Sequence, residues 1–315
     1  MKKKTITAVI NKKFDEWLAS ITDNTVKNLV KENSIVTGGC IASMLLKETV
    51  NDFDFYFTNK ETVKAVAEYY VKQWNEANHD DGYVLDGANI ADIEHHNKVR
   101  AEGGGVALNM TADRIKIIFE SNGVAKEEGA ISDADEIEEW PDGKPVVEEE
   151  SKPKYRPIYL SCNAITLSNQ VQIVIRFYGD PDNIHQHYDY VHCTNYWLSK
   201  TREVTLKQPA LEALLARELR YIGSKYPLAS VIRTRKFIKR GWTINAGQYL
   251  KMAFQISELN LKDVSVLEDQ LTGVDVAYFN ILIDALVRHS AKEKEEKKDF
   301  VLEYSYLATI IDKIF

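Results

Sequence analysis

The sequence predicts an α+β protein, in which a mixed β-sheet with flanking helices is followed by an all-helical C-terminal body. Short runs rich in β-branched and aromatic residues, the signature of strands, recur between residue 35 and about residue 194. From about residue 208 onward the apolar residues are spaced as on a helix. Strands first and helices afterward are typical of an α+β domain followed by a helical one. We therefore expect two domains, a head over residues 1–205 and a body over residues 206–315.

The composition is that of an ordinary globular protein, and 315 residues are enough for two domains. Hydrophobic residues make up 44% and charged residues 28%, and no apolar stretch approaches the roughly 20 residues that a membrane helix needs. The basic N-terminus lacks the apolar core of a signal peptide. Three cysteines (Cys40, Cys162 and Cys193) fit a reducing compartment rather than a disulfide framework. We expect a soluble cytoplasmic protein with no membrane partner. The net charge of −7 leaves room for a local basic face that binds nucleic acid.

The first half of the chain combines helices, short strands and one acidic segment. Residues 12–33 and 60–77 have helical apolar spacing. Short strands are expected at 83–86, 106–110 and 114–120. Residues 126–151 hold eleven acidic side chains against two basic ones, with Pro and Gly interspersed. This composition predicts a mobile acidic insertion over residues 126–152.

Strands resume after the acidic segment. Residues 158–167 and 170–178 read as strands joined by a hairpin turn near Ser168 and Asn169, and residues 188–193 read as a further aromatic strand. Helices of the body are expected at 208–222, 227–240, 246–257, 274–290 and 297–314. The body is therefore predicted to contain helices only.

Residues 35–57 carry the strongest functional pattern. A β-branched run leads into Gly38 and Gly39, an apolar helical stretch follows, and an aromatic strand then carries Asp52 and Asp54. Because glycine has no Cβ, a Gly-Gly turn lets the backbone approach a phosphate closely. The N-terminus of the following helix offers N–H groups to the same anion. Gly38 and Gly39 therefore predict a phosphate-binding turn.

Asp52 and Asp54 stand two residues apart on the predicted strand. Both side chains point to one face, while Phe53 and Phe55 point to the other. The aromatic surroundings indicate a buried strand, in which two carboxylates need a compensating cation. An all-oxygen site suits Mg²⁺ or Mn²⁺. A surface strand with two solvated aspartates is the alternative, but the phosphate turn and the paired carboxylates together favour nucleotidyl transfer.

A family resemblance rests on a Gly-Gly turn, a helix with paired leucines and Asp-x-Asp, found here as Gly38, Gly39, Leu45, Leu46, Asp52 and Asp54. With this order the segment resembles the nucleotidyltransferase superfamily of DNA polymerase beta. Its spacing is most similar to the head of CCA-adding enzymes and bacterial poly(A) polymerases. The chain departs from their pattern early in the helix, because Ala42 and Ser43 stand where those enzymes have Arg-Asp.

Two downstream segments resemble the same enzymes in part. Residues 161–165 look like their Thr-x-Asn-Ala-Leu segment, without the Arg-Arg-Asp that normally precedes it. Residues 226–244 are similar to their neck helix, with Ala229 and Ile232 where base-reading arginines are expected. The overall texture also looks like that of nucleotidyltransferase-like proteins of large bacteriophages, which would place the protein in the cytoplasm of a bacterial host.

The resemblance implies a third carboxylate on a neighbouring strand, which completes the metal site and accepts the proton of the attacking hydroxyl. Asp189 is the first candidate, because its aromatic neighbours match those of Asp54. Glu120 is the second candidate. A strand-edge aspartate in a turn is the alternative interpretation of Asp189.

A group of histidines lies near Asp189. His185, His187, His192 and Cys193 suggest zinc by composition, but they lack the second well-spaced pair of a closed site. Histidines beside a phosphate-handling cleft, or at the end of a strand, are the favoured interpretation.

The helix 227–240 is strongly basic. Together with Lys225 it holds six positive charges within sixteen residues and no acid. Either a solvated amphipathic face or a contact to a triphosphate or an RNA backbone explains this pattern. Arg235 and Lys236 are its candidate nucleotide contacts, as Ser43 is in the head. Trp242 and Tyr249 are candidates for stacking a base or for packing in the core.

These observations predict a metal-dependent nucleotidyltransferase that transfers NMP from an NTP and releases pyrophosphate. Asp52, Asp54 and Asp189 would bind Mg²⁺ or Mn²⁺, and Gly38 and Gly39 would hold the phosphates. An RNA 3′ end, including a tRNA-like one, is the favoured acceptor. A protein or small-molecule hydroxyl, as for a nucleotidylating toxin or signalling enzyme, stays open, and so does a catalytically inactive binding or virion-associated protein of the same fold. The sequence leaves the NTP, the acceptor and the oligomeric state open.

Overall fold

The computed structural model describes residues 1–78, 84–86, 107–110, 115–118, 123–125, 153–161, 163–261, 266 and 270. The chain forms two compact units. The first contains the described residues up to Gln186 together with His192–Leu215, and the second contains His187–Val191 and the described residues from Ala216 onward. The predicted acidic insertion, Glu120 and the two last predicted helices lie outside the described residues. The predicted domain boundary between residues 205 and 206 stays a prediction.

Two helices open the first unit where one was expected to span residues 12–33. Helix α1 covers Lys3–Ser20 and α2 covers Asn24–Asn33. Between them Asp23 caps α2, because its side chain accepts hydrogen bonds from the N–H groups of Thr25 and Val26. The apolar spacing continues across residues 21–23 and therefore does not reveal that the helix is interrupted there. The capping aspartate marks the start of the second helix.

The large sheet of the first unit has the strand order β11-β10-β1-β2-β9-β8-β7-β6. Strand β2 runs parallel to β9, and the other neighbours run antiparallel, so the sheet is mixed. The predicted α+β class with a mixed sheet is therefore confirmed. The strands are β1 (Ser34–Thr37), β2 (Phe53–Phe57), β6 (Gly123–Ala125), β7 (Pro157–Ser161), β8 (Ala164–Leu167), β9 (Val171–Tyr178), β10 (Tyr196–Leu198) and β11 (Glu203–Thr205).

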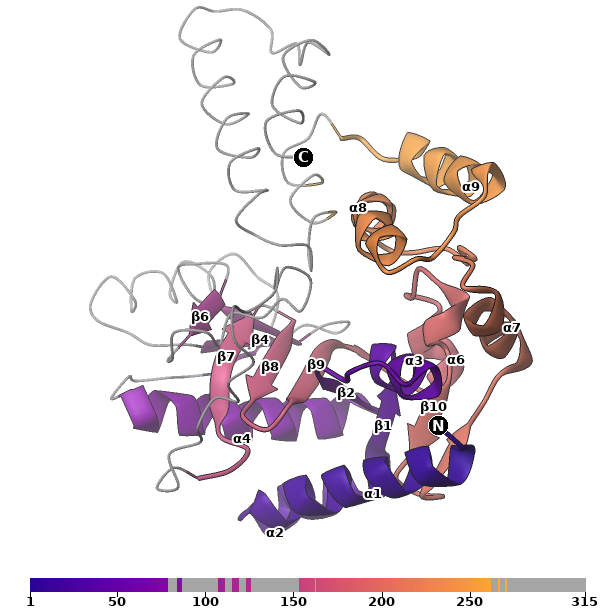
Figure 1. The fold of residues 1–315 in the computed structure, drawn as a ribbon. Coiled ribbons are helices and arrows are strands. Elements are labelled where there is room, and N and C mark those ends of the chain that lie inside the picture. The colour runs from indigo at the N-terminus through magenta and orange to yellow at the C-terminus, as the bar shows by residue number, and fades with distance from the viewer. Residues whose placement is uncertain are drawn as a thin grey trace, which may run out of the picture. The chain divides into compact units, whose positions relative to one another are not determined.

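One face of this sheet carries the apolar core. Helices α1, α2 and α4 (Lys60–Asn78) run along that face (Figure 1). Phe14 and Trp17 of α1 are fully buried, and their rings contact Phe55 of β2 at centroid distances of 6.1 and 4.5 Å. Phe14 also contacts Trp197 of β10 at 5.0 Å. Aromatic residues from α1, β2 and β10 therefore fix the helix on the sheet.

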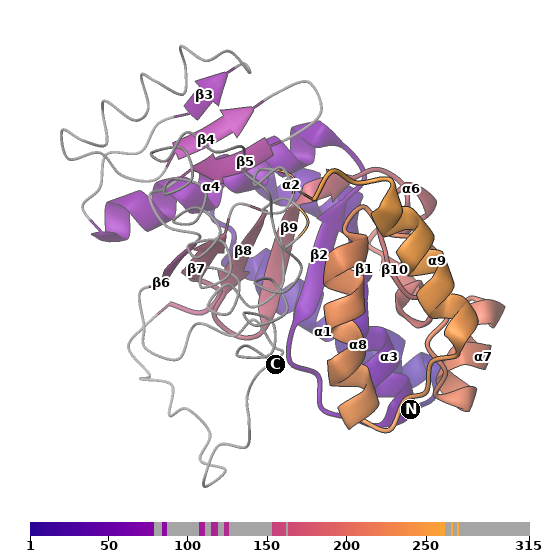
Figure 2. The ribbon, with the colours of Figure 1, turned by 90° about the horizontal axis from the view of Figure 1, so that it is seen from above.

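A second, three-stranded sheet adjoins α4 (Figure 2). Its strands are β3 (Val84–Asp86), β4 (Ala107–Met110) and β5 (Ile115–Ile118), in that order. All three lie within the segments predicted as strands, so these predictions are confirmed. Leu108, Met110, Ile115 and Ile117 are buried and extend the core of the first unit.

The expected strand at 158–167 is in fact two antiparallel strands, β7 and β8. The chain turns between them because the Ser161 hydroxyl accepts hydrogen bonds from the N–H groups of Asn163 and Ala164, at 3.4 and 3.0 Å. The predicted hairpin turn between β8 and β9 is confirmed. Asn169 and Gln170 adopt positive φ angles of 63° and 58° in that turn.

The prediction of a strand at 188–193 is wrong. Val191–Cys193 form a 3-10 helix, and Tyr190 makes only an isolated bridge, to Tyr221. The Tyr190 ring is fully buried, and its hydroxyl donates to the carbonyl of Ser230 at 2.7 Å. Tyr190 is therefore buried within the second unit, against the helix that carries Ser230, and not within a sheet. Strands β10 and β11, which follow, were not expected.

Helix α6 (Pro181–His185) lies between β9 and β10. The helices that follow the last strand are α7 (Gln208–Ala216), α8 (Pro227–Lys239) and α9 (Ala246–Ser257). Helix α9 has the predicted bounds, and α8 ends one residue early. The expected helix at 208–222 ends at Ala216, because Arg217 adopts a positive φ of 48°. None of the helices in the described part of the chain is long and apolar enough to cross a membrane.

Candidate active site

The turn between β1 and α3 (Gly39–Leu46) requires glycine at its first position. Gly38 has φ 95° and ψ −149°, a conformation that residues with a Cβ rarely adopt. Its N–H donates to the carbonyl of Cys193 at 3.1 Å. Because that donor is engaged, the N–H groups of the first turn of α3 are the donors that an anion at this turn could use. A Cβ added at Gly39 would meet no atom within 4 Å, so open space adjoins the turn.

Asp54 lies beside the first turn of α3. The Cys40 thiol, in that turn, is buried, and its pKa is raised first by burial and then by the negative charge of Asp54. The thiol is therefore neutral, and α3 contacts β2, the strand that carries Asp54. Asp54 is half-buried, between the buried Phe53 and Phe55 on the opposite face. Asp52, also half-buried, immediately precedes β2.

A row of polar residues crosses the sheet on the face opposite the core. Asp54 pairs with Gln172 of β9, and Gln172 pairs with Thr166 of β8. On the other side, Val36 of β1 pairs with Phe55, and Thr37 follows Val36 where Asp54 precedes Phe55 on the antiparallel strand. The site therefore combines a glycine turn, a helix N-terminus and a carboxylate on one polar face, and these oxygen donors suit a hard divalent cation.

Thr37, just before the turn, is held by a buried histidine. Its hydroxyl donates to the Asn195 carbonyl at 2.9 Å, so it must accept from Nε2–H of His185 at 2.8 Å. The other ring nitrogen, Nδ1, then accepts from the Lys207 ammonium at 3.3 Å. Burial and then the Lys207 charge lower the pKa of His185 to about 4. His185 is thus a neutral residue that orients the end of β1.

The predicted site residues divide between the two units. Gly38, Gly39, Ser43, Asp52 and Asp54 lie together in the first unit, around α3 and β2. Ser43 stands one turn beyond Gly39 on α3 and is half-buried. The common role of these residues in one site stays a prediction.

Asp189, Arg235 and Lys236 belong to the second unit. Asp189 accepts a hydrogen bond from Arg233 at 2.9 Å, and its side chain is only 14% exposed. Arg235 is exposed on α8 and Lys236 is half-buried. The role of Asp189 as third carboxylate stays a prediction. Within the described residues, no three His, Cys, Asp or Glu side chains form a group that could hold a metal ion.

The described part of the second unit is basic, although the whole chain is acidic. Over residues 187–191 and 216–261, nine Lys and Arg stand against three Asp and Glu. Trp242, a candidate for base stacking, is 4% exposed and packs edge-on against Phe237 at 5.6 Å, so core packing is its observed role. Tyr249 is 38% exposed on α9.

Sequence reasoning missed Thr37, His185 as its partner, and Gln172. The alternation of apolar and polar residues along 171–176 places Gln172 on the polar face. That alternation is visible in the sequence, whereas the pairing of Gln172 with Asp54 depends on strand order.

The fold and the site define an α+β protein whose mixed sheet carries a glycine turn beside a carboxylate. The profile of the Gabija anti-defense 2 family matches residues 8–217, two thirds of the chain. The protein therefore belongs to the Gabija anti-defense 2 family. The match includes the whole β1–α3–β2 segment.

Two individual proteins are similar to this chain. The "Gabija anti-defense 2" protein of Bacillus phage SPbetaL7 is 24% identical over 143 residues, which are 45% of this chain. The match spans 32%, about a third, of that relative's length. The structure of the Thermotoga maritima CCA-adding enzyme complexed with tRNA_CCA aligns with 91% of this chain and 62% of its own, at 11% identity and a TM-score of 0.34. That likeness is too remote to assign a fold or a function.

Proposed function

We propose that this protein counteracts the Gabija defence by transferring a nucleotide from an NTP to an acceptor hydroxyl. Membership of the family supports the first part of the proposal. The second part rests on one observation, the position of the Asp54 carboxylate beside the glycine turn and the N-terminus of α3. Such a turn binds phosphate, and a carboxylate next to it holds a divalent ion on the same phosphates.

In this mechanism the β- and γ-phosphates of the NTP lie at the Gly38–Gly39 turn. Asp52 and Asp54 hold Mg²⁺ or Mn²⁺, which when bound neutralises the phosphate charge and favours ionisation of the acceptor hydroxyl. The acceptor oxygen attacks the α-phosphorus, and the bond to the bridging oxygen breaks. Pyrophosphate leaves with the bonding electron pair, on the side opposite the attack.

The acceptor that we propose is an RNA 3′ end, with the basic part of the second unit, residues 187–191 and 216–261, as its binding surface. Nine positive side chains against three negative ones suit a polyanion, and Arg235 and Lys236 lie on α8 within this unit. RNA binding by this surface would weaken as salt rises. A hydroxyl on a protein or on a small molecule is the other acceptor class, and the labelling experiment separates the two.

A non-catalytic binding protein is the second candidate function. Two observations favour it. Ala42 and Ser43 replace the Arg-Asp of the CCA-adding pattern, and no group of three metal-ligating side chains occurs in the described part of the first unit. Such a protein would bind the nucleotide, or a component of the defence, without turnover.

The test measures transfer and protection with the same variants. Protein is incubated with each α-³²P-labelled NTP, Mg²⁺ or Mn²⁺ and total bacterial RNA, and the label is followed into RNA and protein. Cells that carry the Gabija defence and express each variant are challenged with a phage that the defence restricts. We expect wild type to label RNA and to restore plaques, and Asp52→Ala/Asp54→Ala to lose both.

Asp15→Asn is the matched control, because Asp15 is an exposed carboxylate of α1, paired with Arg202. It should retain transfer and protection. Protection by the double aspartate variant at the wild-type level would refute the catalytic proposal and leave the binding function. Label on protein instead of RNA would show that the acceptor is a protein hydroxyl and not an RNA 3′ end.

A further inference from the structure

The sheet register places a side chain of β9 directly beside Asp54. Gln172 pairs with Asp54 across the parallel strands β9 and β2. Paired residues of neighbouring strands point to the same face, and their backbones lie about 4.8 Å apart. Val171 and Ile173, on either side of Gln172, are 0% exposed on the core face. Gln172 must therefore point to the polar face, as Asp54 does.

The side-chain amide of Gln172 is not committed to the fold. Gln172 is half-buried, and its amide makes no hydrogen bond within the described part of the chain. It is also not one of the fully buried polar groups of the described residues, so a ligand can reach it. An accessible amide on the strand next to Asp54, pointing to the same face, can therefore contribute an oxygen to an ion held by that carboxylate.

We propose that Gln172 belongs to the site and supplies, through Oε1, a third protein oxygen for the divalent ion of Asp52 and Asp54. This inference rests on the proposed function. Gln172 is not one of the acidic residues that the sequence pattern predicts as metal ligands. An amide oxygen coordinates hard cations as a carboxylate does, but without charge. Side chains on adjacent strands are close enough to reach one ion between them.

The neutral ligand has a chemical consequence for the transfer. The attack and the departure of pyrophosphate occur on opposite sides of the α-phosphorus, and the acceptor hydroxyl must lose its proton in this step. Gln172 cannot take the acceptor proton, because an amide is not a base at neutral pH. The proton must pass to a carboxylate, either Asp52, Asp54 or the predicted third carboxylate Asp189, or to water.

Mn²⁺ binding in the absence of nucleotide tests the position of Gln172 without requiring activity. Free Mn²⁺ is measured by electron paramagnetic resonance during titration of the full chain. If Oε1 is a ligand, Gln172→Asp should lower the Kd about tenfold, because affinity rises with ligand charge. Gln172→Ala should raise the Kd about threefold, since it removes one oxygen ligand.

Thr166→Asp is the matched control. It adds the same charge on the same face one strand farther away, about 10 Å from Asp54, where the carboxylate cannot reach the ion. Equal affinities of Gln172→Asp and wild type, or equal gains in Gln172→Asp and Thr166→Asp, would overturn the inference. Thermal unfolding identifies any variant that fails to fold, and Gln172→Glu then takes the place of Gln172→Asp.

Asp54→Asn separates this inference from the proposed function. Unchanged Mn²⁺ binding in Asp54→Asn would refute the metal-dependent mechanism, whatever Gln172 does. Loss of binding in Asp54→Asn, with no gain in Gln172→Asp, would retain that mechanism and reject Gln172 as a ligand.

Discussion

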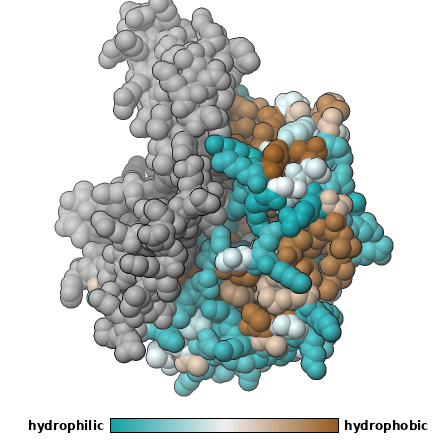
Figure 3. Space-filling model, in the orientation of Figure 1, coloured by the Kyte–Doolittle hydropathy of each residue, from teal (hydrophilic) through white to brown (hydrophobic). Residues whose placement is uncertain are grey.

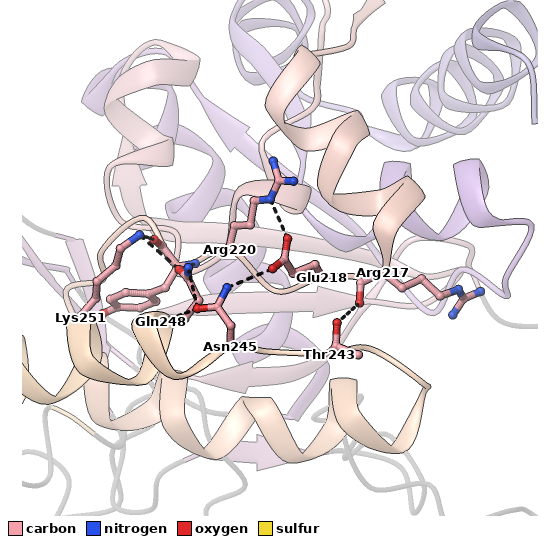
Figure 4. Close-up of polar contacts among 8 residues, drawn as sticks. Arg217, Glu218, Arg220, Thr243, Asn245, Gln248 and Lys251 are labelled. Atoms are coloured by element: carbon pink, nitrogen blue, oxygen red, sulfur yellow. Dashed lines mark hydrogen bonds and ion pairs between the residues drawn. The ribbon is translucent and has the colours of Figure 1, made fainter.

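The two units of the protein are stabilised in different ways. In the first, aromatic rings of α1, β2 and β10 pack together and are fully buried. In the second, residues 217–221 contact α9 through polar groups (Figure 4). Hydrophobic side chains remain exposed on α9 instead (Figure 3), with Leu250 58% and Phe254 72% exposed. The second unit also buries aromatic rings, among them Tyr190 and Trp242 against Phe237. The comparison teaches that apolar packing supports both units, and that the second adds a network of directional hydrogen bonds between residues 217–221 and α9.

The polar contacts of the second unit form one chain of interactions. The Glu218 carboxylate accepts from Arg220 at 3.2 Å and from Asn245 at 3.1 Å. Gln248 accepts from the N–H of Tyr221 at 2.9 Å and from Lys251 at 3.2 Å. Each such bond contributes about 1 kcal/mol, so no single one should dominate this unit.

Trp17→Ala should have the largest effect on stability. The ring is 0% exposed and contacts Phe14 and Phe55, so its removal leaves a cavity under the sheet. It also removes the hydrogen bond from Nε1 to the Tyr70 hydroxyl, of 2.8 Å. We expect a loss of about 3–5 kcal/mol in urea unfolding. A loss below about 1 kcal/mol would contradict the apolar scaffold.

Acidification should destabilise the first unit through His185. The folded pKa of about 4 lies below the ordinary 6.5, so the unfolded chain binds the proton more readily between these values. The contribution of His185 is therefore fully present above pH 6.5 and is lost as the pH falls toward 4, by up to about 3 kcal/mol. Urea unfolding of wild type and His185→Gln at pH 7.5, 6 and 5 should show the two curves converging. Parallel curves would mean that His185 does not titrate differently on folding.

Asp189→Asn should have an intermediate effect and sharpens the comparison. The partly buried Arg233 loses its charged partner, for which we expect about 1.5–3 kcal/mol in urea unfolding. The same variant tests the third carboxylate. If Asp189 is catalytic, transfer should fall as far as in Asp54→Asn, even at temperatures where the variant is fully folded. Full transfer would assign Asp189 to structure alone.

Asn245→Ala should have the smallest of these effects. Asn245 caps α9 by accepting from the N–H of Gln248 at 3.3 Å, and it also donates to Glu218. A lost N-cap costs about 1 kcal/mol, measured as a shift of the urea midpoint. Asn245→Asp keeps the cap and should restore most of the stability. Failure of Asn245→Asp to do so would place the effect in the bond to Glu218.

Local patterns predicted much of the fold. Helix α9 and the β1–α3–β2 segment follow from periodicity and from the two glycines. The prediction failed where tertiary contacts decide, since Tyr190 is buried by the second unit and not by a strand. Strands β10 and β11 have three residues each, too few for a periodic signal.

The candidate site could be located from the sequence only where it is local. Gly38, Gly39, Ser43, Asp52 and Asp54 are close in the sequence and lie in one unit, and their role as a site stays a prediction. Gln172 was missed because β9 lies next to β2 only through the order of the strands.

The pairing of Gln172 with Asp54 has a genetic consequence. The codons of glutamine differ from those of glutamate in their first base alone. One transversion at this codon would therefore add a negative charge next to Asp54, without altering the strand or its register. Natural variants at this single codon would show whether phage populations have sampled the more acidic form and whether it persists.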